Sequence, residues 1–354
     1  MLTQILRKMS MNYPKYFYLS DKTGHRRATL LSSSTVGKDS AISIPDIFEA
    51  AKIPVTFDVI ENFDFSNPVH CETLRKNRYL LLHSSGVDKP ETGIPQINKY
   101  LNLHTSCVKI LNPGHLNSPN QNPAIEIISE CVQSDPSTEE VEIAPRTVRS
   151  LSRVSLEDMK KVARYAFQQA LSNRLRRIIV VHNFAAGKLE EDTFTEAMKE
   201  VRSEYPMIEY LGVSIEECMA QMARDYKSLN LMVMTSGSTR TVSRTRESIS
   251  PRDAIGINIA VGDDQILYNQ KHLPRGLTIG NEVFDPTSLL LGSCCMLKSM
   301  QMYRYSDMLL LALRRVHKDK ELSSQERAEC TVADFMKSLH KELESLSVNA
   351  LPYE

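Results

Sequence analysis

The alternation of short apolar runs with longer amphipathic stretches constrains the fold of this chain more than any other feature. Between the short runs, apolar residues recur every three or four positions, as they do along one face of a helix. A chain that alternates strand and helix pairs its strands in parallel, because each helix returns the chain to the same end of the sheet. The predicted strands are residues 28–31, 55–60, 79–82, 124–128, 178–181 and 229–234. The sequence therefore predicts an α/β protein.

The predicted helices are best defined in the middle and at the carboxyl end of the chain. Ser155 and Asp158 have the spacing of a capping box, which marks a helix start. The apolar residues behind them follow helical spacing: Met159, Val162, Ala163, Ala166, Phe167 and Ala170. Further helices are predicted at residues 194–201, 286–297, 308–316 and 331–346. Residues 239–250 are rich in Ser, Thr and Arg, which predicts an exposed loop or a poorly packed helix start.

Composition excludes several classes of partner. Apolar residues make up 42% of the chain and charged residues 24%, close to the average of soluble globular proteins. Lys+Arg and Asp+Glu are both 43, so a net charge of zero gives no electrostatic argument for nucleic acid or an anionic membrane. No run approaches the roughly 18 apolar residues that a membrane helix requires. We predict a soluble protein with no nucleic-acid or membrane partner.

Cysteine, histidine and glycine also limit the chemistry. The seven cysteines are scattered without a C-x-x-C pair, as expected of buried thiols in a reducing compartment, and the nine histidines show no zinc-binding spacing. Only 13 of 354 residues are glycine, against an average of roughly 7%. Because backbone that approaches a phosphate usually contains glycine, this shortage argues against a working cofactor loop.

The amino-terminal segment is basic and poor in acids. Arg7, Lys8 and Lys15 precede the first acidic residue, Asp21. This composition predicts a mitochondrial presequence over residues 1–25, and a disordered extension is the alternative.

Several segments resemble the subunits of NAD-dependent isocitrate dehydrogenase, within the isocitrate/isopropylmalate dehydrogenase family. Residues 162–167 (V-A-R-Y-A-F) and 180–182 (V-V-H) are similar to the family's R-I-A-x-Y-A-F and V-T-A-V-H-K. Residues 289–297 (L-L-L-G-S-C-C-M-L) are similar to T-L-L-A-S-C-M-M-L, and the order of such segments holds from Arg26 to Leu346. The resemblance implies an isopropylmalate dehydrogenase-like fold, with two domains around a central mixed sheet and a small-domain clasp. It also implies a location in the mitochondrial matrix.

The expected domains follow from the same resemblance. The large domain is discontinuous and comprises residues 26–106 plus 250–354. Residues 107–249 form a small domain that makes the dimer contacts in the family.

The family's reaction transfers a hydride from the substrate to NAD and releases carbon dioxide with the help of a divalent metal. It requires arginines for the substrate carboxylates, a Lys and a Tyr for proton transfer, and aspartates for the metal. This chain has Asn98, Val108 and Ser129 at or near the arginine positions. Pro136 stands at the tyrosine position and Asn183 at the lysine position, and an amide cannot relay a proton as an amine can. The resemblance therefore implies a chain without catalytic or substrate-binding residues.

The metal positions have changed in charge. Arg240 and Arg244 replace two family carboxylates that share one helix face at i and i+4. A guanidinium carries a permanent positive charge and cannot ligate a cation. Glu216 matches a third family carboxylate, which a neighbouring subunit normally receives, although a solvated helix glutamate is the simpler explanation.

The nucleotide positions are also degraded. His272 and Asp285 are remnants of the family's cofactor-binding segments, and an N-cap of the following helix is a sufficient reason for Asp285. We expect no tightly bound cofactor, with NAD and Mg²⁺ implied by the resemblance alone.

Three functions remain as predictions. The first is a noncatalytic, regulatory or structural subunit of the tricarboxylic acid cycle enzyme, in a hetero-oligomer with a catalytic subunit. The second is a stand-alone pseudoenzyme with a binding or tissue-specific role, and the third a dehydrogenase completed by groups from elsewhere. Arg240 and Arg244 would then bind an anionic effector or a partner's acids, such as Glu216 of another copy, or they reflect drift after catalysis was lost. Ser152 and Ser243 carry a weak kinase pattern, Arg-x-x-Ser.

Overall fold

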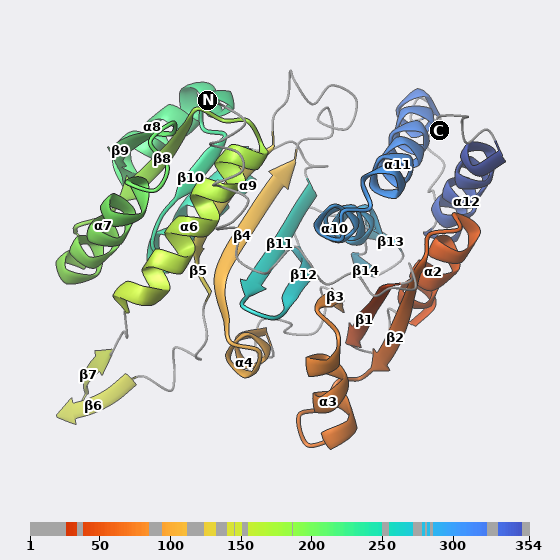
Figure 1. The fold of residues 1–354 in the computed structure, drawn as a ribbon, viewed down its shortest axis with the longest axis horizontal. Helices are drawn as coiled ribbons and strands as arrows, with labels where there is room; N and C mark the ends of the chain where they lie inside the picture. Colours follow the sequence, from red (N-terminus) through yellow and green to blue (C-terminus); the bar gives the residue numbers. More distant parts are fainter. Residues whose placement is uncertain are drawn as a thin grey trace.

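The chain folds around a ten-stranded mixed sheet with helices on both faces (Figure 1). The computed structural model describes residues 26–33, 38–84, 94–111, 124–131, 140–144, 146–150, 155–185, 187–249, 255–271, 278–279, 282–283, 286–323 and 332–348. The predicted presequence and the site positions Pro136, His272 and Asp285 lie outside these residues. This architecture confirms the predicted α/β class.

The strands occur along the whole chain. They are β1 (Arg26–Ser33), β2 (Val55–Glu61), β3 (Tyr79–Ser84), β4 (Leu103–Leu111), β5 (Ile125–Glu130), β6 (Glu140–Ala144), β7 (Thr147–Ser150), β8 (Arg177–His182), β9 (Glu209–Ser214), β10 (Leu231–Val233), β11 (Ile255–Gly262), β12 (Ile266–Lys271), β13 (Thr278–Ile279) and β14 (Glu282–Val283). Each of the six predicted strands overlaps an observed one, in β1, β2, β3, β5, β8 and β10. The prediction 124–128 begins one residue before β5, and 229–234 extends beyond both ends of β10.

The helices alternate with these strands and then close the chain. They are α2 (Lys38–Ala50), α3 (Pro68–Lys76), α4 (Ile94–Tyr100), α6 (Leu156–Ser172), α7 (Lys188–Arg202), α8 (Ile215–Asp225), the 3₁₀ turn η3 (Tyr226–Ser228), α9 (Ser236–Ile249), α10 (Pro286–Ser299), α11 (Tyr303–Ser323) and α12 (Val332–Val348).

The strand order of the large sheet is β2-β1-β3-β12-β11-β4-β5-β10-β8-β9. Strands β5, β10, β8 and β9 pair in parallel, as the strand–helix alternation predicts, and so do β2, β1, β3 and β12. The two parallel groups run in opposite directions, because β4 and β11 pair antiparallel with each other and with their outer neighbours. The sheet is therefore mixed, as the resemblance implies.

Apolar side chains fill both faces of the sheet. Successive residues of a strand point to opposite faces, so Ile128 and Val180 belong to the cluster that packs α6, α7 and the three C-terminal helices. Ile127 and Val181 belong to a second cluster, beneath α8 and α9. Full burial of each such side chain contributes about 1.5–3 kcal/mol, so this double-sided core is the main source of stability.

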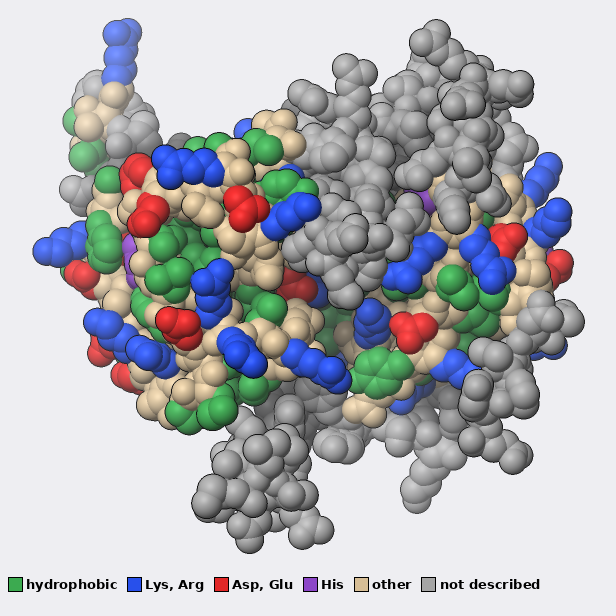
Figure 2. Space-filling view, turned by 90° about the horizontal axis from the view of Figure 1, so that it is seen from above, with side chains coloured by type: hydrophobic (Ala, Val, Ile, Leu, Met, Phe, Trp, Pro, Cys, Tyr) green, Lys and Arg blue, Asp and Glu red, His purple; other side chains and the backbone are tan. Residues whose placement is uncertain are grey.

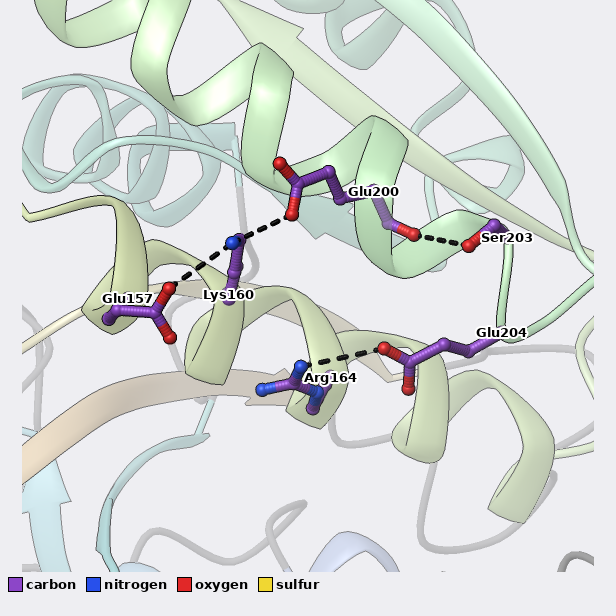
Figure 3. Close-up of polar contacts among 6 residues, drawn as sticks. All are labelled: Glu157, Lys160, Arg164, Glu200, Ser203 and Glu204. Atoms are coloured by element: carbon purple, nitrogen blue, oxygen red, sulfur yellow. Dashed lines mark hydrogen bonds and ion pairs between the residues drawn. The ribbon is translucent and has the colours of Figure 1, made fainter.

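Helices α6 and α7 lie side by side and are joined by surface ion pairs (Figure 3). Lys160 Nζ lies 3.2 Å from Glu157 and 2.7 Å from Glu200, and Arg164 contacts Glu204 at 3.5 Å. Exposed pairs of this kind contribute little to stability, roughly 0–1 kcal/mol each, so the packing beneath them fixes the two helices. Ser155 precedes the first turn of α6 as predicted, but its side chain makes no capping hydrogen bond.

The prediction for residues 239–250 was wrong. Residues 236–249 form the regular helix α9, which buries Val242, Ser243 and Arg246 against the sheet side. The hydroxyl groups of Thr239, Thr245 and Ser248 each donate a hydrogen bond to the carbonyl one turn earlier, which satisfies them inside the helix. Composition suggested a loop because Ser and Thr are common in turns, but tertiary contacts override that preference.

The predicted division into two domains stays a prediction. The ten-stranded sheet takes β1, β2, β3, β11 and β12 from the predicted large domain and β5, β8, β9 and β10 from the predicted small domain. The β6–β7 hairpin lies apart from this sheet, within the region where the resemblance places the clasp (Figure 1). Within the described residues, no helix has the length and apolar character needed to cross a membrane.

Candidate functional site

Among the described residues, the position that the resemblance matches to the family's catalytic lysine lies at the end of β8. Asn183 directly follows β8 and is half-buried, beside the well-packed ring of His182. Its partner position in the resemblance, Pro136, is not among the described residues. At Asn183 the structure offers a neutral amide and no group that could accept and release a proton at neutral pH.

The substrate-arginine positions are buried in apolar or neutral surroundings. Asn98 lies on α4 and is 6% exposed, and Val108 is part of the apolar cluster beneath α8 and α9. Ser129 lies on β5, where its hydroxyl donates to the carbonyl of Glu130. The pairing of β4 with β5 brings Val108 and Ser129 onto the same sheet face. None of the three side chains carries a positive charge, so they cannot hold a substrate carboxylate as arginines do.

Arg240 and Arg244 lie on the outer face of α9. Both side chains are exposed, one helical turn apart. Helix α8 packs beside α9 on the same face of the sheet and carries Glu216, also exposed, in its first turn. In the described part of the chain, neither arginine forms an ion pair, with Glu216 or any other acid. The structure thus brings the three metal-position residues onto two neighbouring helices without joining them.

A divalent metal does not fit this arrangement. Two guanidinium groups at i and i+4 repel a cation, and one glutamate is a weak ligand set by itself. Among the residues that the structure describes, no group of three or more His, Cys, Asp or Glu side chains is placed to hold a metal ion. No chemical step through a metal can be built from these residues.

A buried hydrogen-bond network lies next to Asn183, and sequence reasoning missed it. Glu191, on α7, is only 2% exposed. Its carboxylate lies 3.2 Å from His182 Nδ1 and accepts a hydrogen bond from the Thr235 hydroxyl at 3.2 Å. The other ring nitrogen, His182 Nε2, lies 2.9 Å from the hydroxyl of Tyr210. An ionised carboxylate only accepts, so His182 donates to Glu191 from Nδ1.

The geometry of β9 makes this network possible. Tyr210 and His182 meet above Gly212, where a Cβ atom would lie 3.4 Å from the Tyr210 ring and 3.5 Å from His182 Nε2. Burial raises the pKa of Tyr210, which keeps its hydroxyl protonated. Each polar atom of the network therefore has a hydrogen-bond partner inside the protein.

Glu130, at the end of β5, is also held by a hydrogen bond within the protein. One of its carboxylate oxygens accepts a 2.7 Å hydrogen bond from the backbone N–H of Ser236, at the start of α9. Burial raises the pKa of Glu130, and the bond from Ser236 opposes that rise. The pKa of Glu190, half-buried nearby, is raised by burial and by the negative charges of Glu130 and Glu191. A helix amino terminus that could hold a ligand anion is here satisfied by the protein's own carboxylate.

The signals for these groups were weak in the sequence. Glu190 and Glu191 look like ordinary first-turn acids of a helix, and only the 3.6-residue period of α7 places Glu191 on the same side as Phe194 and Met198. Ser243 is buried, 3% exposed, and donates to the Arg240 carbonyl, so it is not accessible to a kinase in this fold. Ser152 lies outside the described residues.

Comparison with known proteins shows which proteins this chain is similar to. No protein-family model matches the chain. Regulatory subunit 1 of the mitochondrial NAD-dependent isocitrate dehydrogenase of Arabidopsis thaliana is 27% identical over 308 residues, which cover 82% of each chain. Regulatory subunit 2 of the same plant is 26% identical, again with 82% of each chain covered. The solved structure of isocitrate dehydrogenase from Methylococcus capsulatus superimposes with a TM-score of 0.73 at 17% identity, over 90% of this chain and 99% of that one.

The fold is therefore isocitrate dehydrogenase-like. Along most of its length the chain is similar to subunits of the NAD-dependent enzyme, which confirms the resemblance derived from its sequence. The names of these relatives include the word mitochondrial, in agreement with the predicted location.

Proposed function

We propose that this chain is a noncatalytic subunit of a mitochondrial NAD-dependent isocitrate dehydrogenase and acts by assembling with a catalytic subunit. The observation that carries the proposal is the pair of exposed arginines, Arg240 and Arg244, at the positions where the resemblance places metal carboxylates. Asn183 at the lysine position and the uncharged residues at the substrate positions support it. A chain that keeps the fold without these groups can still act through association or shape, which need no turnover.

The similarity to regulatory subunits supports the same function. A regulatory subunit acts by binding its partner differently in the partner's two conformational states, and this requires an intact surface but no chemistry. The β6–β7 hairpin, with Ile143 52% exposed, is one surface that a partner strand or side chain could cover. An anionic effector bound to Arg240 and Arg244 would change that coupling without any catalysis.

Co-expression with a catalytic NAD-dependent isocitrate dehydrogenase subunit tests the proposal. The two chains are separated by size-exclusion chromatography, and NADH production is measured for each peak, with and without citrate as an anionic probe. We expect co-elution, a changed Michaelis constant or rate for the catalytic subunit, and no NADH production by this chain alone. An Arg240→Ala/Arg244→Ala variant should assemble yet lose any response to citrate.

Two outcomes would contradict the proposal. Separate elution, with no effect on the catalytic subunit, would favour a stand-alone pseudoenzyme. NADH production by the purified chain alone would show that the missing groups are replaced from elsewhere in the fold.

A further inference from the structure

A buried histidine lies next to a surface ion pair near the start of β4. His104 is 7% exposed. Its Nδ1 atom lies 2.7 Å from the hydroxyl oxygen of Thr105, and its Nε2 atom lies 3.6 Å from a carboxylate oxygen of Asp263. The other carboxylate oxygen of Asp263 lies 3.1 Å from Lys161 Nζ, on α6. One carboxylate therefore stands between a histidine and a lysine.

An irregularity in the pairing of β4 with β11 places the histidine there. The register shifts at Gly262, which leaves His104 between two paired residues of β4 as the extra residue of a β-bulge. A bulge re-aims a side chain from its regular direction. Gly262 also lets the turn between β11 and β12 approach β4, because a Cβ atom there would lie 2.8 Å from Leu103 Cδ2. The turn that carries Asp263 is thus packed against the start of β4.

The ionisable groups around His104 come from three elements: Asp263 from the turn, Lys161 and Asp158 from α6, and Cys131 from the end of β5, whose N–H donates to the His104 carbonyl. Burial lowers the pKa of His104, Asp263 and Asp158 oppose this change, and Lys161 adds to it. Burial raises the pKa of the Cys131 thiol, which therefore stays neutral. At neutral pH the imidazole is uncharged, and Lys161 is the counter-ion of Asp263.

The Lys161–Asp263 pair joins parts of the chain that the sequence assigns to different domains. Lys161 belongs to the predicted small domain, and both His104 and Asp263 belong to the predicted large domain. Figure 2 shows Lys and Arg side chains interspersed with Asp and Glu side chains over one face of the molecule, so exposed charges of opposite sign are common neighbours there. The Lys161–Asp263 pair differs from an ordinary surface pair because a histidine of the predicted large domain competes for its carboxylate.

We propose that His104, Asp263 and Lys161 form a pH-sensitive latch, in which protonation of His104 draws the Asp263 carboxylate from Lys161 to the imidazolium. At neutral pH the carboxylate binds Lys161 and holds α6 to the β11–β12 turn. On acidification His104 takes a proton from water and gains both a charge and a second donor. The contact between the two predicted domains is then weakened. The latch goes beyond the proposed function, because it acts within this chain whether or not a catalytic subunit binds.

The latch responds to acid and not to base. The pKa of His104 in the folded protein lies below the ordinary histidine value of 6.5. As pH falls below that value, the unfolded state binds the proton before the folded state does. The stability that neutral His104 contributes is therefore fully present above pH 6.5, and it is lost as pH falls toward the folded pKa.

The first test measures the pKa of His104 by NMR titration of the histidine Cε1–H signals of the purified full chain, with His104→Gln to assign the signal. We expect a value below 6.5. Lys161→Met should raise this pKa, because a nearby positive charge is removed. Asp263→Asn should lower it, because the negative charge that favours the imidazolium is removed.

The second test measures the latch itself by hydrogen–deuterium exchange of residues 262–267 and 156–163 at pH 7.5 and pH 5.5, with rates corrected for the intrinsic effect of pH. We expect protection in the wild type to fall about threefold at the lower pH, the size of one exposed ion pair. His104→Gln, which stays neutral and keeps a polar side chain beside Thr105, should show no such fall. The matched control is His340→Gln on α12. It removes a histidine that lies 3.2 Å from Glu344 at the surface, and it should respond to pH as the wild type does.

Three results would overturn the latch: an equal fall in protection in the wild type and in His104→Gln, a pKa of His104 at or above 6.5, or a pKa that Lys161→Met leaves unchanged. Lys161 is partly exposed, so its variant tests the latch even if His104→Gln proves unfolded by circular dichroism. If the latch fails but the chain binds a catalytic subunit, the proposed function stands. If the latch responds as expected in a chain that binds no catalytic subunit, the proposed function fails and the latch stands.

Discussion

Charged residues in the core of this protein differ from those on the outer face of α8 and α9 in whether they have a partner. Inside, Lys109 lies 2.8 Å from Glu126, which also accepts a hydrogen bond from Asn173, and Glu191 is bound by His182 and Thr235. Outside, Glu216, Glu217, Arg240 and Arg244 have no ionic partner within the described residues.

The difference distinguishes charges that the stability of the fold requires from charges that are available to bind partners. An unpaired charge in the core costs several kcal/mol, so buried charges must be matched wherever the fold persists. An exposed charge costs almost nothing, so it is free to change with function. The arginines of α9 that stand where the resemblance implies carboxylates lie on an exposed face, where a substitution can alter binding without harming stability. Substitutions in the two sets should therefore differ in what they affect.

The largest expected effect is on the Lys109–Glu126 pair. Burial by itself would lower the pKa of Lys109, but the carboxylate of Glu126 raises it well above its usual range. Lys109→Met leaves that carboxylate without its counter-charge, and we expect a loss of roughly 3–5 kcal/mol in the free energy of unfolding. Urea denaturation followed by circular dichroism measures it. The double variant Lys109→Met/Glu126→Leu should recover most of the loss, and equal losses for the single and double variants would contradict the account.

The His182–Glu191 network should be the next most sensitive. Glu191→Ala leaves His182 and Thr235 without their acceptor in the core, and we expect a loss of about 2–4 kcal/mol. Glu190→Ala is the matched control. Glu190, the neighbour of Glu191 in sequence, is half-buried, and its pKa is raised by burial and by two adjacent carboxylates. That change should be neutral or slightly stabilising at pH 7. Equal effects at the two positions would show that the network does not stabilise the fold.

Much of the frame could be predicted from the sequence, because buried strands and amphipathic helices follow simple periodicities. Residues 178–181 and 229–234 were predicted as strands because short, largely apolar runs of that length fill a sheet buried on both faces. The antiparallel pairing of β4 with β11 could not be predicted, because it depends on which strands meet in space and not on local pattern. The strand β9 was missed because it lies at the sheet edge and none of its six residues is buried, so its sequence has no continuous apolar run.

Some residues of the candidate site could likewise be predicted from the sequence, and others could not. The resemblance predicts site positions at Asn183, Arg240 and Arg244, because each lies at a fixed place in a recognisable segment. It could not reveal that Glu130 would cap α9, since residues 130 and 236 are brought together only by the pairing of β5 with β10. Helix α9 was misjudged for a related reason, because the partner that satisfies its first turn is distant in sequence.

Glu130 should give the protein a distinct pH dependence. Its pKa in the folded protein is raised by burial, so the folded state binds more protons than the unfolded state as pH rises above the ordinary glutamate value of 4.5. Stability contributed at lower pH is therefore lost as pH rises through the folded pKa. Glu130→Gln keeps an oxygen that can accept from Ser236 and removes the titrating group.

The effect is measured as the free energy of unfolding of the wild type and of Glu130→Gln between pH 5 and pH 8. Its expected size is that of one hydrogen bond, about 1 kcal/mol. We expect the variant to gain stability relative to the wild type as pH rises. Glu130→Leu, which also removes the acceptor, should be less stable than Glu130→Gln at every pH. A constant difference between Glu130→Gln and the wild type would mean that Glu130 does not titrate as the fold implies.

The smallest effect on stability is expected at the arginines of the outer face. Arg240→Ala with Arg244→Ala should change the free energy of unfolding by less than about 0.5 kcal/mol, as exposed unpaired charges generally do. Arg246 is the contrasting residue on the same helix, since it is 1% exposed and its guanidinium lies 4.3 Å from the centre of the Tyr226 ring. Arg246→Ala should cost about 2 kcal/mol through lost packing and cation–π contact. If the outer pair proved as costly to remove as Arg246, those arginines would be part of the fold, and their exchange for the family's carboxylates would need a structural cause within this chain instead of a partner.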